Sequence, residues 1–108
     1  MVNEKRAVRL LQDLVRINSE NPPDDCRKIA AFVRKQMESA GLSVKTYEYR
    51  KGAPVLVGTL RGVGKGRRAS LLLVPHMDTV PAGSGWKHDP FRAEIINGRM
   101  YGRGVQDC

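Results

Sequence analysis

A histidine and an aspartate stand two positions apart in the segment Val74–Gly83, which reads VPHMDTVPAG. His76 and Asp78 directly follow an apolar run, and side chains at positions i and i+2 of an extended chain point to the same side. A histidine that binds zinc usually donates its other ring N–H to a carboxylate, which fixes the tautomer of the ring. The spacing therefore suggests a metal ligand together with the carboxylate that orients it, and a surface His-x-Asp pair is the alternative.

A second group of candidate residues occurs in the last segment of the sequence, NGRMYGRGVQDC. Gly102 and Gly104 permit a tight backbone path, because glycine adopts conformations that other residues avoid. Such a path can bring the carboxylate of Asp107 close to another loop. Arg103, between the two glycines, is expected to be structural or solvated.

Three ring side chains lie between these two groups, in the segment GWKHDPF. Trp86 and Phe91 are placed so that they could wall a cleft, but we expect them to be packing residues. His88 is expected to be an ordinary loop residue.

The composition indicates a folded protein of at most one domain. The sequence has 108 residues, of which 41% are hydrophobic and 28% charged, as in soluble globular proteins. No apolar run approaches the roughly 18 to 20 residues that a membrane span requires, and the first residues lack an apolar segment of the signal-peptide kind. We therefore expect a cytoplasmic protein without membrane contact. Cys26 and Cys108 are far apart and are expected to be reduced thiols.

The formal net charge of +8 comes from 19 lysines and arginines spread along the whole chain. A nucleic-acid-binding protein gathers such residues on one face, with aromatic platforms where single strands are bound. The few aromatic residues here are not interleaved with the charge. We therefore expect solvated helix faces and loops, with attraction of an anionic substrate or of nucleic acid as the alternatives.

The hydrophobic periodicity changes along the chain from the helical to the extended pattern. Asn3 is a candidate cap for the first helix, Gly41 is a natural end for the second, and Asn97-Gly98 is a two-residue hairpin turn. The expected elements are helices over residues 3–17 and 24–40, strands over 42–49, 54–60 and 69–74, a loop over 62–68, and a hairpin of 91–96 with 99–101.

The segment Ala69–Val74, ASLLLV, is apolar on both faces and is therefore expected at the centre of its sheet. Helices followed by strands, one of them buried, predict an α/β domain. We expect layers: a central, mostly parallel or mixed sheet flanked by helices.

Several of these segments, in this order and spacing, resemble one family of zinc metallohydrolases and metallopeptidases. The matching segments are HMDTVPAG, W-x-x-DPF, NGRMYGRG with Asp107, and the opening LLQDLVRINSENPP. The family contains acetylornithine deacetylase, succinyl-diaminopimelate desuccinylase, aminoacylase and the glutamate carboxypeptidases. The resemblance covers residues 1–108 as the amino-terminal part of a catalytic domain. The lid or dimerisation domain and the carboxy-terminal half of the catalytic domain have no counterpart in the sequence.

The resemblance implies roles for three residues. His76 would bind one zinc ion, Asp107 would bridge two zinc ions, and Asp78 would be the catalytic-site carboxylate that orients His76. The implied cofactor is zinc, two ions in the complete site, or cobalt in their place. Cys108 stands where the family often has methionine. The family's later glutamate pair, which supplies the general base and a ligand, has no counterpart here.

The implied function is zinc-dependent hydrolysis of an amide bond in an N-acyl amino acid or a small peptide. The complete protein would be a homodimer that acts on a small molecule, and the 108 residues alone are expected to be inactive. The alternative is a non-catalytic basic module, which either binds nucleic acid or is a degenerate relative with a role in assembly.

Overall fold

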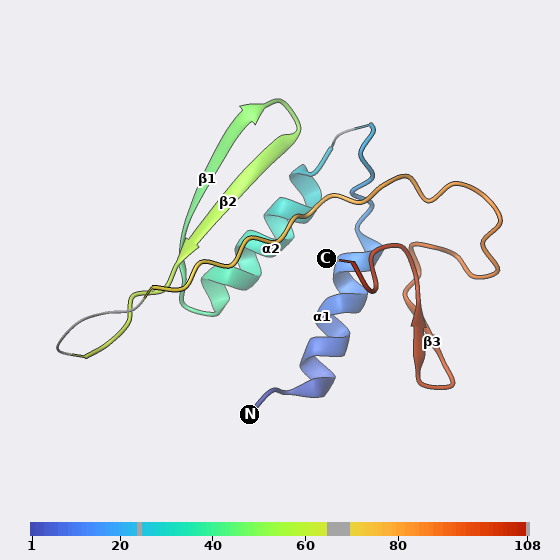
Figure 1. Cartoon of the computed structure of the whole chain (residues 1–108), viewed down its shortest axis with the longest axis horizontal. Helices are drawn as coiled ribbons and strands as arrows, with labels where there is room; N and C mark the ends of the chain where they lie inside the picture. Colours follow the sequence, from blue (N-terminus) through green and yellow to red (C-terminus); the bar gives the residue numbers. More distant parts are fainter. Residues whose placement is uncertain (24, 65–69, 108) are drawn as a thin grey trace.

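The computed structural model describes residues 1–23, 25–64 and 70–107 (Figure 1). Its elements are α1 (Glu4–Arg16), α2 (Arg27–Ser39), β1 (Ser43–Arg50), β2 (Ala53–Thr59), β3 (Glu94–Ile96) and β4 (Arg99–Tyr101). The expected α/β class is confirmed. The sheets differ from the expected central sheet, since the strands form two separate antiparallel pairs, β1–β2 and β3–β4. Parallel pairing among the described residues is limited to one isolated bridge, between Glu20 and Thr79.

Helix α1 begins where the sequence predicts. The side chain of Asn3 accepts a hydrogen bond of 3.0 Å from the backbone N–H of Arg6, which satisfies one of the unpaired donors of the first turn. Near its other end the helix holds the segment that precedes β3. Gln12 donates to the carbonyl of Ala93 at 2.9 Å, and Val15 is buried. This contact fixes the carboxy-terminal hairpin beside α1.

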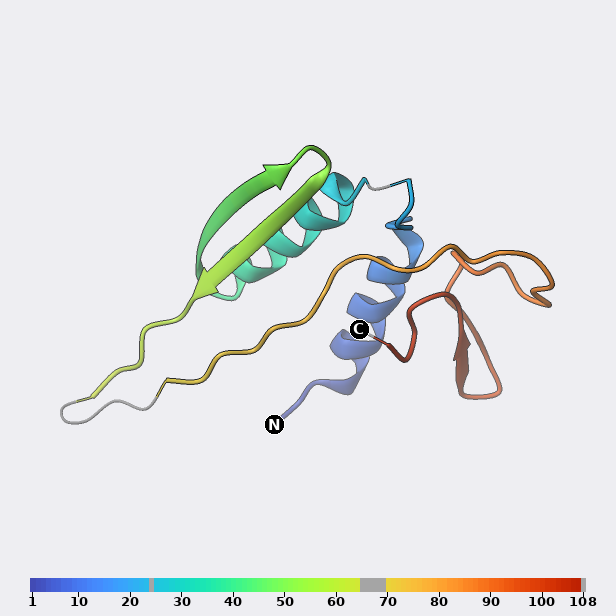
Figure 2. The same ribbon diagram turned by 45° about the horizontal axis from the view of Figure 1, so that its top comes forward.

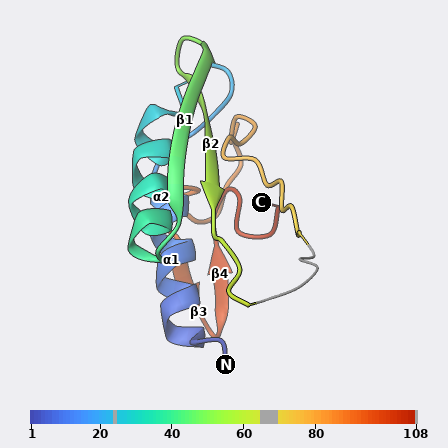
Figure 3. The ribbon, with the colours of Figure 1, turned by 90° about the vertical axis from the view of Figure 1, so that its left-hand side faces the viewer.

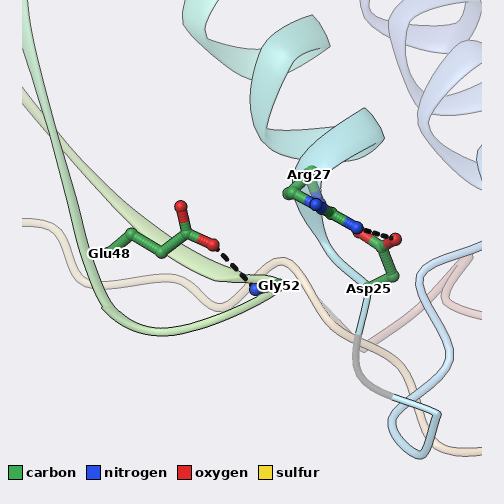
Figure 4. Close-up of polar contacts among 4 residues, drawn as sticks. All are labelled: Asp25, Arg27, Glu48 and Gly52. Carbon is green, nitrogen blue, oxygen red and sulfur yellow. Dashed lines mark hydrogen bonds and ion pairs between the residues drawn. The ribbon is translucent and has the colours of Figure 1, made fainter.

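Helix α2 begins at Arg27, later than the predicted start at position 24, which itself lies outside the described residues. Just before the helix, the Oδ2 atom of Asp25 lies 2.8 Å from Nη2 of Arg27 (Figure 4). This bond lowers the pKa of Asp25 to about 2. The helix ends as predicted, with Gly41 at a φ of +88° that favours glycine. No helix among the described residues is long and apolar enough to cross a membrane.

The hairpin β1–β2 packs against α2 (Figures 2 and 3). Both strands confirm the predicted ones to within a residue. A Cβ atom on Gly58 would lie 2.8 Å from Cδ2 of Leu42 and 3.1 Å from Cε of Met37, so the glycine permits close packing at this point. At the turn, Glu48 accepts a hydrogen bond of 2.7 Å from the backbone N–H of Gly52 (Figure 4). The hairpin and α2 thus form one layered unit.

The predicted buried strand over residues 69–74 is wrong for residues 70–74, and residue 69 lies outside the described residues. Residues 70–74 form no strand, and the side chains of Leu71, Leu72, Leu73 and Val74 are 77% to 84% exposed. An apolar sequence shows only that the side chains of a strand would favour burial. Burial also requires neighbouring strands and covering layers, and within the part of the chain that the structure describes β1 and β2 pair only with each other. The segment instead crosses the molecule as extended chain (Figure 2).

The second hairpin confirms the predicted Asn-Gly turn. Asn97 and Gly98 both have positive φ, 49° and 76°, as the favoured two-residue turn requires. Its first strand is shorter than expected, beginning at Glu94, because Phe91 and Arg92 form a turn instead.

The hydrophobic core is small. Among the described residues, the buried apolar ones are Val15, Cys26, Ile29, Ala30 and Ala93. Cys108 lies outside the described residues. The radius of gyration is 16.0 Å, against about 13 Å for a compact domain of this length. The apolar faces of α1 and α2 border a cavity of about 370 Å³, which also reaches His76 and Asp107.

Candidate functional site

The ring of His76 lies between two aspartates, the two that the sequence singles out. Its Nδ1 atom is 2.9 Å from the backbone oxygen of Asp78 and 3.3 Å from Oδ1 of the same residue. Its Nε2 atom is 3.4 Å from Oδ1 of Asp107. The three candidate residues are therefore brought together, although they belong to two loops separated by the β3–β4 hairpin.

Acceptor oxygens face both ring nitrogens of His76, and the nearest of them faces Nδ1. Both atoms that face Nδ1 are oxygens of Asp78, which only accept hydrogen bonds, so Nδ1–H is the favoured tautomer. The unprotonated Nε2 then faces a carboxylate, which is also an acceptor. The hydrogen bond to the Asp78 backbone, followed by the carboxylate of Asp107, raises the pKa of His76. The arrangement favours a positive charge between His76 and Asp107.

The carboxylate of Asp78 has a second partner, Asn21. The side-chain amide of Asn21 donates a hydrogen bond of 2.9 Å to Oδ2 of Asp78. This bond is the main cause that lowers the pKa of Asp78, and His76 adds a smaller effect. One carboxylate oxygen therefore faces Asn21 and the other faces His76.

The loop after Asp78 is held by the segment that follows α1. Thr79 donates its N–H to the carbonyl of Ser19 at 3.0 Å and accepts from the N–H of Asn21 at 2.8 Å. Glu20 accepts from the N–H of Ala82 at 2.7 Å, a bond that is the main cause of a lowered pKa of Glu20. These bonds join residues 19–21 to the loop at several points.

Glycines place Asp107 near the ring, as the sequence predicts. A Cβ atom on Gly102 would lie 2.7 Å from Cγ1 of Val15 and 3.1 Å from the carbonyl oxygen of Pro90, so this position accepts only glycine without rearrangement. Gly104 has a φ of +85°, where non-glycine residues are strained. The chain can thereby pass close to α1 and turn toward His76.

Arg103 and Trp86 lie together beside this loop. The guanidinium carbon of Arg103 is 5.3 Å from the centroid of the Trp86 ring, a cation–π geometry, and Trp86 donates to the carbonyl of Ala82 at 2.8 Å. Both residues therefore have structural contacts, as expected. Phe91 is partly buried and lines the cavity of about 370 Å³.

His88 lies away from the pair of aspartates. Its Nδ1 atom is 3.5 Å from Oε2 of Glu94, and its ring is 4.3 Å from that of Tyr101 between centroids. These contacts place His88, a loop residue as expected, against the β3–β4 hairpin.

The distance between His76 and Asp107 fits a shared zinc ion. Tetrahedral zinc with bonds of about 2.1 Å to nitrogen and oxygen separates its donor atoms by about 3.4 Å, and Nε2 and Oδ1 are 3.4 Å apart. A charge-assisted hydrogen bond would be shorter, about 2.7 to 2.9 Å. Within the described residues no group of three or more His, Cys, Asp or Glu side chains could hold a metal ion. His76 and Asp107 thus offer two potential donors, fewer than the four ligands of a tetrahedral zinc ion.

The sequence interpretation missed Asn21 and Glu20. It assigned no role to either residue, whereas Glu20 and Asn21 hold the loop that carries Asp78. The signal in the sequence was a group of polar side chains directly after an amphipathic helix. Such side chains can donate and accept hydrogen bonds.

A model of peptidase family M20/M25/M40 matches residues 72–108. Succinyl-diaminopimelate desuccinylase of Methylobacterium radiotolerans is 34% identical over 103 residues, which are 94% of this chain and 26% of the relative. Cysteinylglycine-S-conjugate dipeptidase of Corynebacterium striatum is 31% identical, over 93% of this chain and 24% of that protein.

A third relative has a different name again. N-formyl-4-amino-5-aminomethyl-2-methylpyrimidine deformylase of Bacillus subtilis is 28% identical, over 97% of this chain and 25% of the relative. The chain spans about a quarter of the length of the curated relatives it matches. The family model covers both His76 and Asp107, and the relatives cover nearly all of the chain. The chain therefore belongs to peptidase family M20/M25/M40, as an amino-terminal part of such a protein.

Proposed function

We propose that this chain forms part of a zinc-dependent enzyme that hydrolyses an amide bond in an N-acyl amino acid or a small peptide. In this proposal His76 and Asp107 bind zinc, and Asp78 orients His76. Asp107 would bridge two zinc ions, as the family resemblance implies.

The observation that carries the proposal is the position of His76 between the two aspartates. Asp78 accepts from Nδ1, so the lone pair of Nε2 is directed to Oδ1 of Asp107 at 3.4 Å. Neither of these two acceptors can donate a hydrogen bond to the other, so a proton on Nε2 or a cation between the two atoms makes the contact favourable. A proton can fill that place in the metal-free protein, and zinc fits the separation of the two donors.

The chain's own residues would then hold the zinc ion and orient the ring of His76. Zinc, when bound, supplies Lewis acidity that polarises an amide carbonyl and lowers the pKa of water. Asp78 keeps the proton of His76 on Nδ1, which leaves Nε2 free to bind the metal. The general base is not among the residues assigned here.

The substrate class is supported by the names of the relatives. They are a desuccinylase, a deformylase and a dipeptidase, and each of these names describes cleavage of an amide bond to an acyl or aminoacyl group. We propose the same class of substrate for the complete protein. Several further points stay predictions: that residues 1–108 alone are inactive, that the complete protein is a cytoplasmic homodimer, and that it contacts neither nucleic acid nor a membrane.

The test compares the two histidines of the sequence in the protein as its native host makes it. Zinc content and affinity, together with hydrolysis of a panel of N-acyl amino acids and dipeptides, are measured for wild type, His76→Gln and His88→Gln. We expect His76→Gln to lose tight zinc binding and hydrolysis, and His88→Gln to retain both. Equal zinc affinity and hydrolysis in all three proteins would overturn the assignment of His76.

The protein prepared for this test also tests the alternative function, a non-catalytic basic module that binds nucleic acid. Binding of nucleic acid that weakens with salt and is indifferent to zinc, in a protein that hydrolyses none of the amides, would replace the hydrolase proposal.

A further inference from the structure

The contacts of Asn21 give it a more specific part than that of a turn residue. Its backbone N–H donates to the carbonyl of Thr79 at 2.8 Å, and its side-chain amide donates to Oδ2 of Asp78 at 2.9 Å. The backbone bond and the side-chain bond thus reach adjacent residues of the loop. Asn21 is partly buried, so water competes only in part for Asp78.

The segment that carries Asn21 is itself fixed. Ser19, two residues earlier, is 2% exposed and accepts the N–H of Thr79 at 3.0 Å. Glu20 accepts from the N–H of Ala82 at 2.7 Å. A side chain on such a segment has little freedom to move relative to the loop. Its hydrogen bond therefore selects one orientation of the Asp78 carboxylate.

That orientation decides what His76 meets. With Oδ2 held by Asn21, Oδ1 lies 3.3 Å from Nδ1 of His76. If the amide donor is removed, the carboxylate can rotate about its χ2 torsion, which has broad preferences. The backbone oxygen of Asp78 would then be the one acceptor of that residue still held in place beside Nδ1.

We propose that Asn21 is a positioning residue for the metal site: its side-chain amide holds the carboxylate of Asp78 so that His76 keeps its proton on Nδ1 and presents Nε2 to the metal. This inference rests on the proposed function for the identity of the metal. The orientation of His76 itself does not depend on that identity.

The experiment uses three substitutions in the protein as its native host makes it. Asn21→Asp has the same size but has no amide donor and adds a negative charge near Asp78, whereas Asn21→Gln keeps an amide. Asn18→Ala is the matched control, because Asn18 bonds to Glu20 in the same segment, at 2.9 Å, and leaves the Asn21 side chain in place. Thermal unfolding of each variant reports whether the segment still folds.

Two measurements are made on each protein. Zinc affinity is measured by competition with a chelator, and the ring tautomer of His76 is measured from ¹⁵N chemical shifts in the metal-free protein, assigned with His76→Gln. We expect Asn21→Asp to lower zinc affinity about 10-fold, at the lower end of the range for outer partners of metal ligands, and to shift His76 toward the Nε2–H tautomer. Asn21→Gln should recover part of both, and Asn18→Ala should match wild type.

The outcomes separate this inference from the proposed function. If wild type binds zinc and Asn21→Asp keeps wild-type affinity and tautomer, the positioning role is wrong and the metal site stands. If wild type binds no zinc, the proposed function is wrong, and the tautomer alone decides the role of Asn21. Equal losses in Asn21→Asp and Asn18→Ala would show a general effect of the segment and overturn the specific role.

Discussion

The carboxylate of Glu20 accepts a hydrogen bond of 2.7 Å from the backbone N–H of Ala82, a residue 62 positions later in the chain. This bond is the main cause that lowers the pKa of Glu20. A carboxyl with a lowered pKa stabilises the folded state above its unfolded pKa, and this contribution disappears as the pH falls through the lower folded value. Glu20→Gln should therefore lower the thermal midpoint by a few degrees at pH 7 and by much less in acid.

The measurement is the thermal midpoint of both proteins between pH 7 and about pH 2. Glu4→Gln is the control, because it removes an exposed carboxylate of α1 and leaves the bond to Ala82 in place. A difference between wild type and Glu20→Gln that stays constant across this range would contradict the prediction.

Gly102 should not accept a side chain. In Gly102→Ala the new methyl group would lie 2.7 Å from Cγ1 of Val15 and 3.1 Å from a backbone oxygen, and the backbone oxygen cannot move as a flexible side chain does. Overpacking of this kind costs about 1–3 kcal/mol. We expect a lower denaturant midpoint and, because Asp107 follows in the same segment, weaker zinc binding.

Gly62→Ala is the matched control for this substitution, since a Cβ atom at Gly62 meets nothing within 4 Å. It should unfold at the wild-type denaturant concentration. Equal midpoints for Gly102→Ala and Gly62→Ala would show that the segment around Gly102 relaxes freely.

The two aspartates beside His76 should differ in effect. Asp107→Ala removes a proposed ligand and should abolish tight binding of the metal pair in the complete protein. Asp78→Ala removes a group that acts through His76, so it should weaken zinc binding at least as much as Asn21→Asp, about 10-fold, without abolishing it, and should lower turnover about 10- to 100-fold. Zinc titration and steady-state rates check both. Full zinc occupancy with a normal rate in both variants would contradict the assigned roles.

The surface pair at the start of α2 gives a test that is independent of the metal. Hydrogen bonds from the side chain and backbone of Arg27 lower the pKa of Asp25 to about 2. Titration of the Asp25 carboxyl by NMR should show this midpoint, and Arg27→Gln should raise it toward about 3.9. Both side chains are more than half exposed, so we expect little change in stability. A midpoint that Arg27→Gln leaves unchanged would exclude the pairing.

The parts of the fold that follow from neighbouring residues could be predicted from the sequence. The cap at Asn3, the end of α2 at Gly41 and the Asn97-Gly98 turn each depend on residues within a few positions of one another. The placement of His76 beside Asp78 is local in the same sense. The glycines near Asp107 predicted that the chain there approaches another segment closely. The structure shows that Val15 and Pro90 are the close neighbours that require a glycine at Gly102.

The parts that depend on distant residues could not be predicted. Asn21 and Asp78 are 57 positions apart, and nothing in either segment alone specifies the other as its partner. At residues 70–74 the sequence predicted a buried strand that the structure does not have. Hydropathy correctly indicates side chains that prefer to be buried, but it does not show whether strands are present to cover them.

The four consecutive apolar residues from Leu71 to Val74 have a consequence for the life of the polypeptide in the cell. An extended, exposed apolar segment is a template for pairing with other chains and is the kind of surface that chaperones and proteases recognise. Whether this segment becomes covered, rather than whether the helices and hairpins form, should decide how much of the newly made protein escapes degradation. The segment that leads to His76 and Asp78 is thus also where quality control would act first.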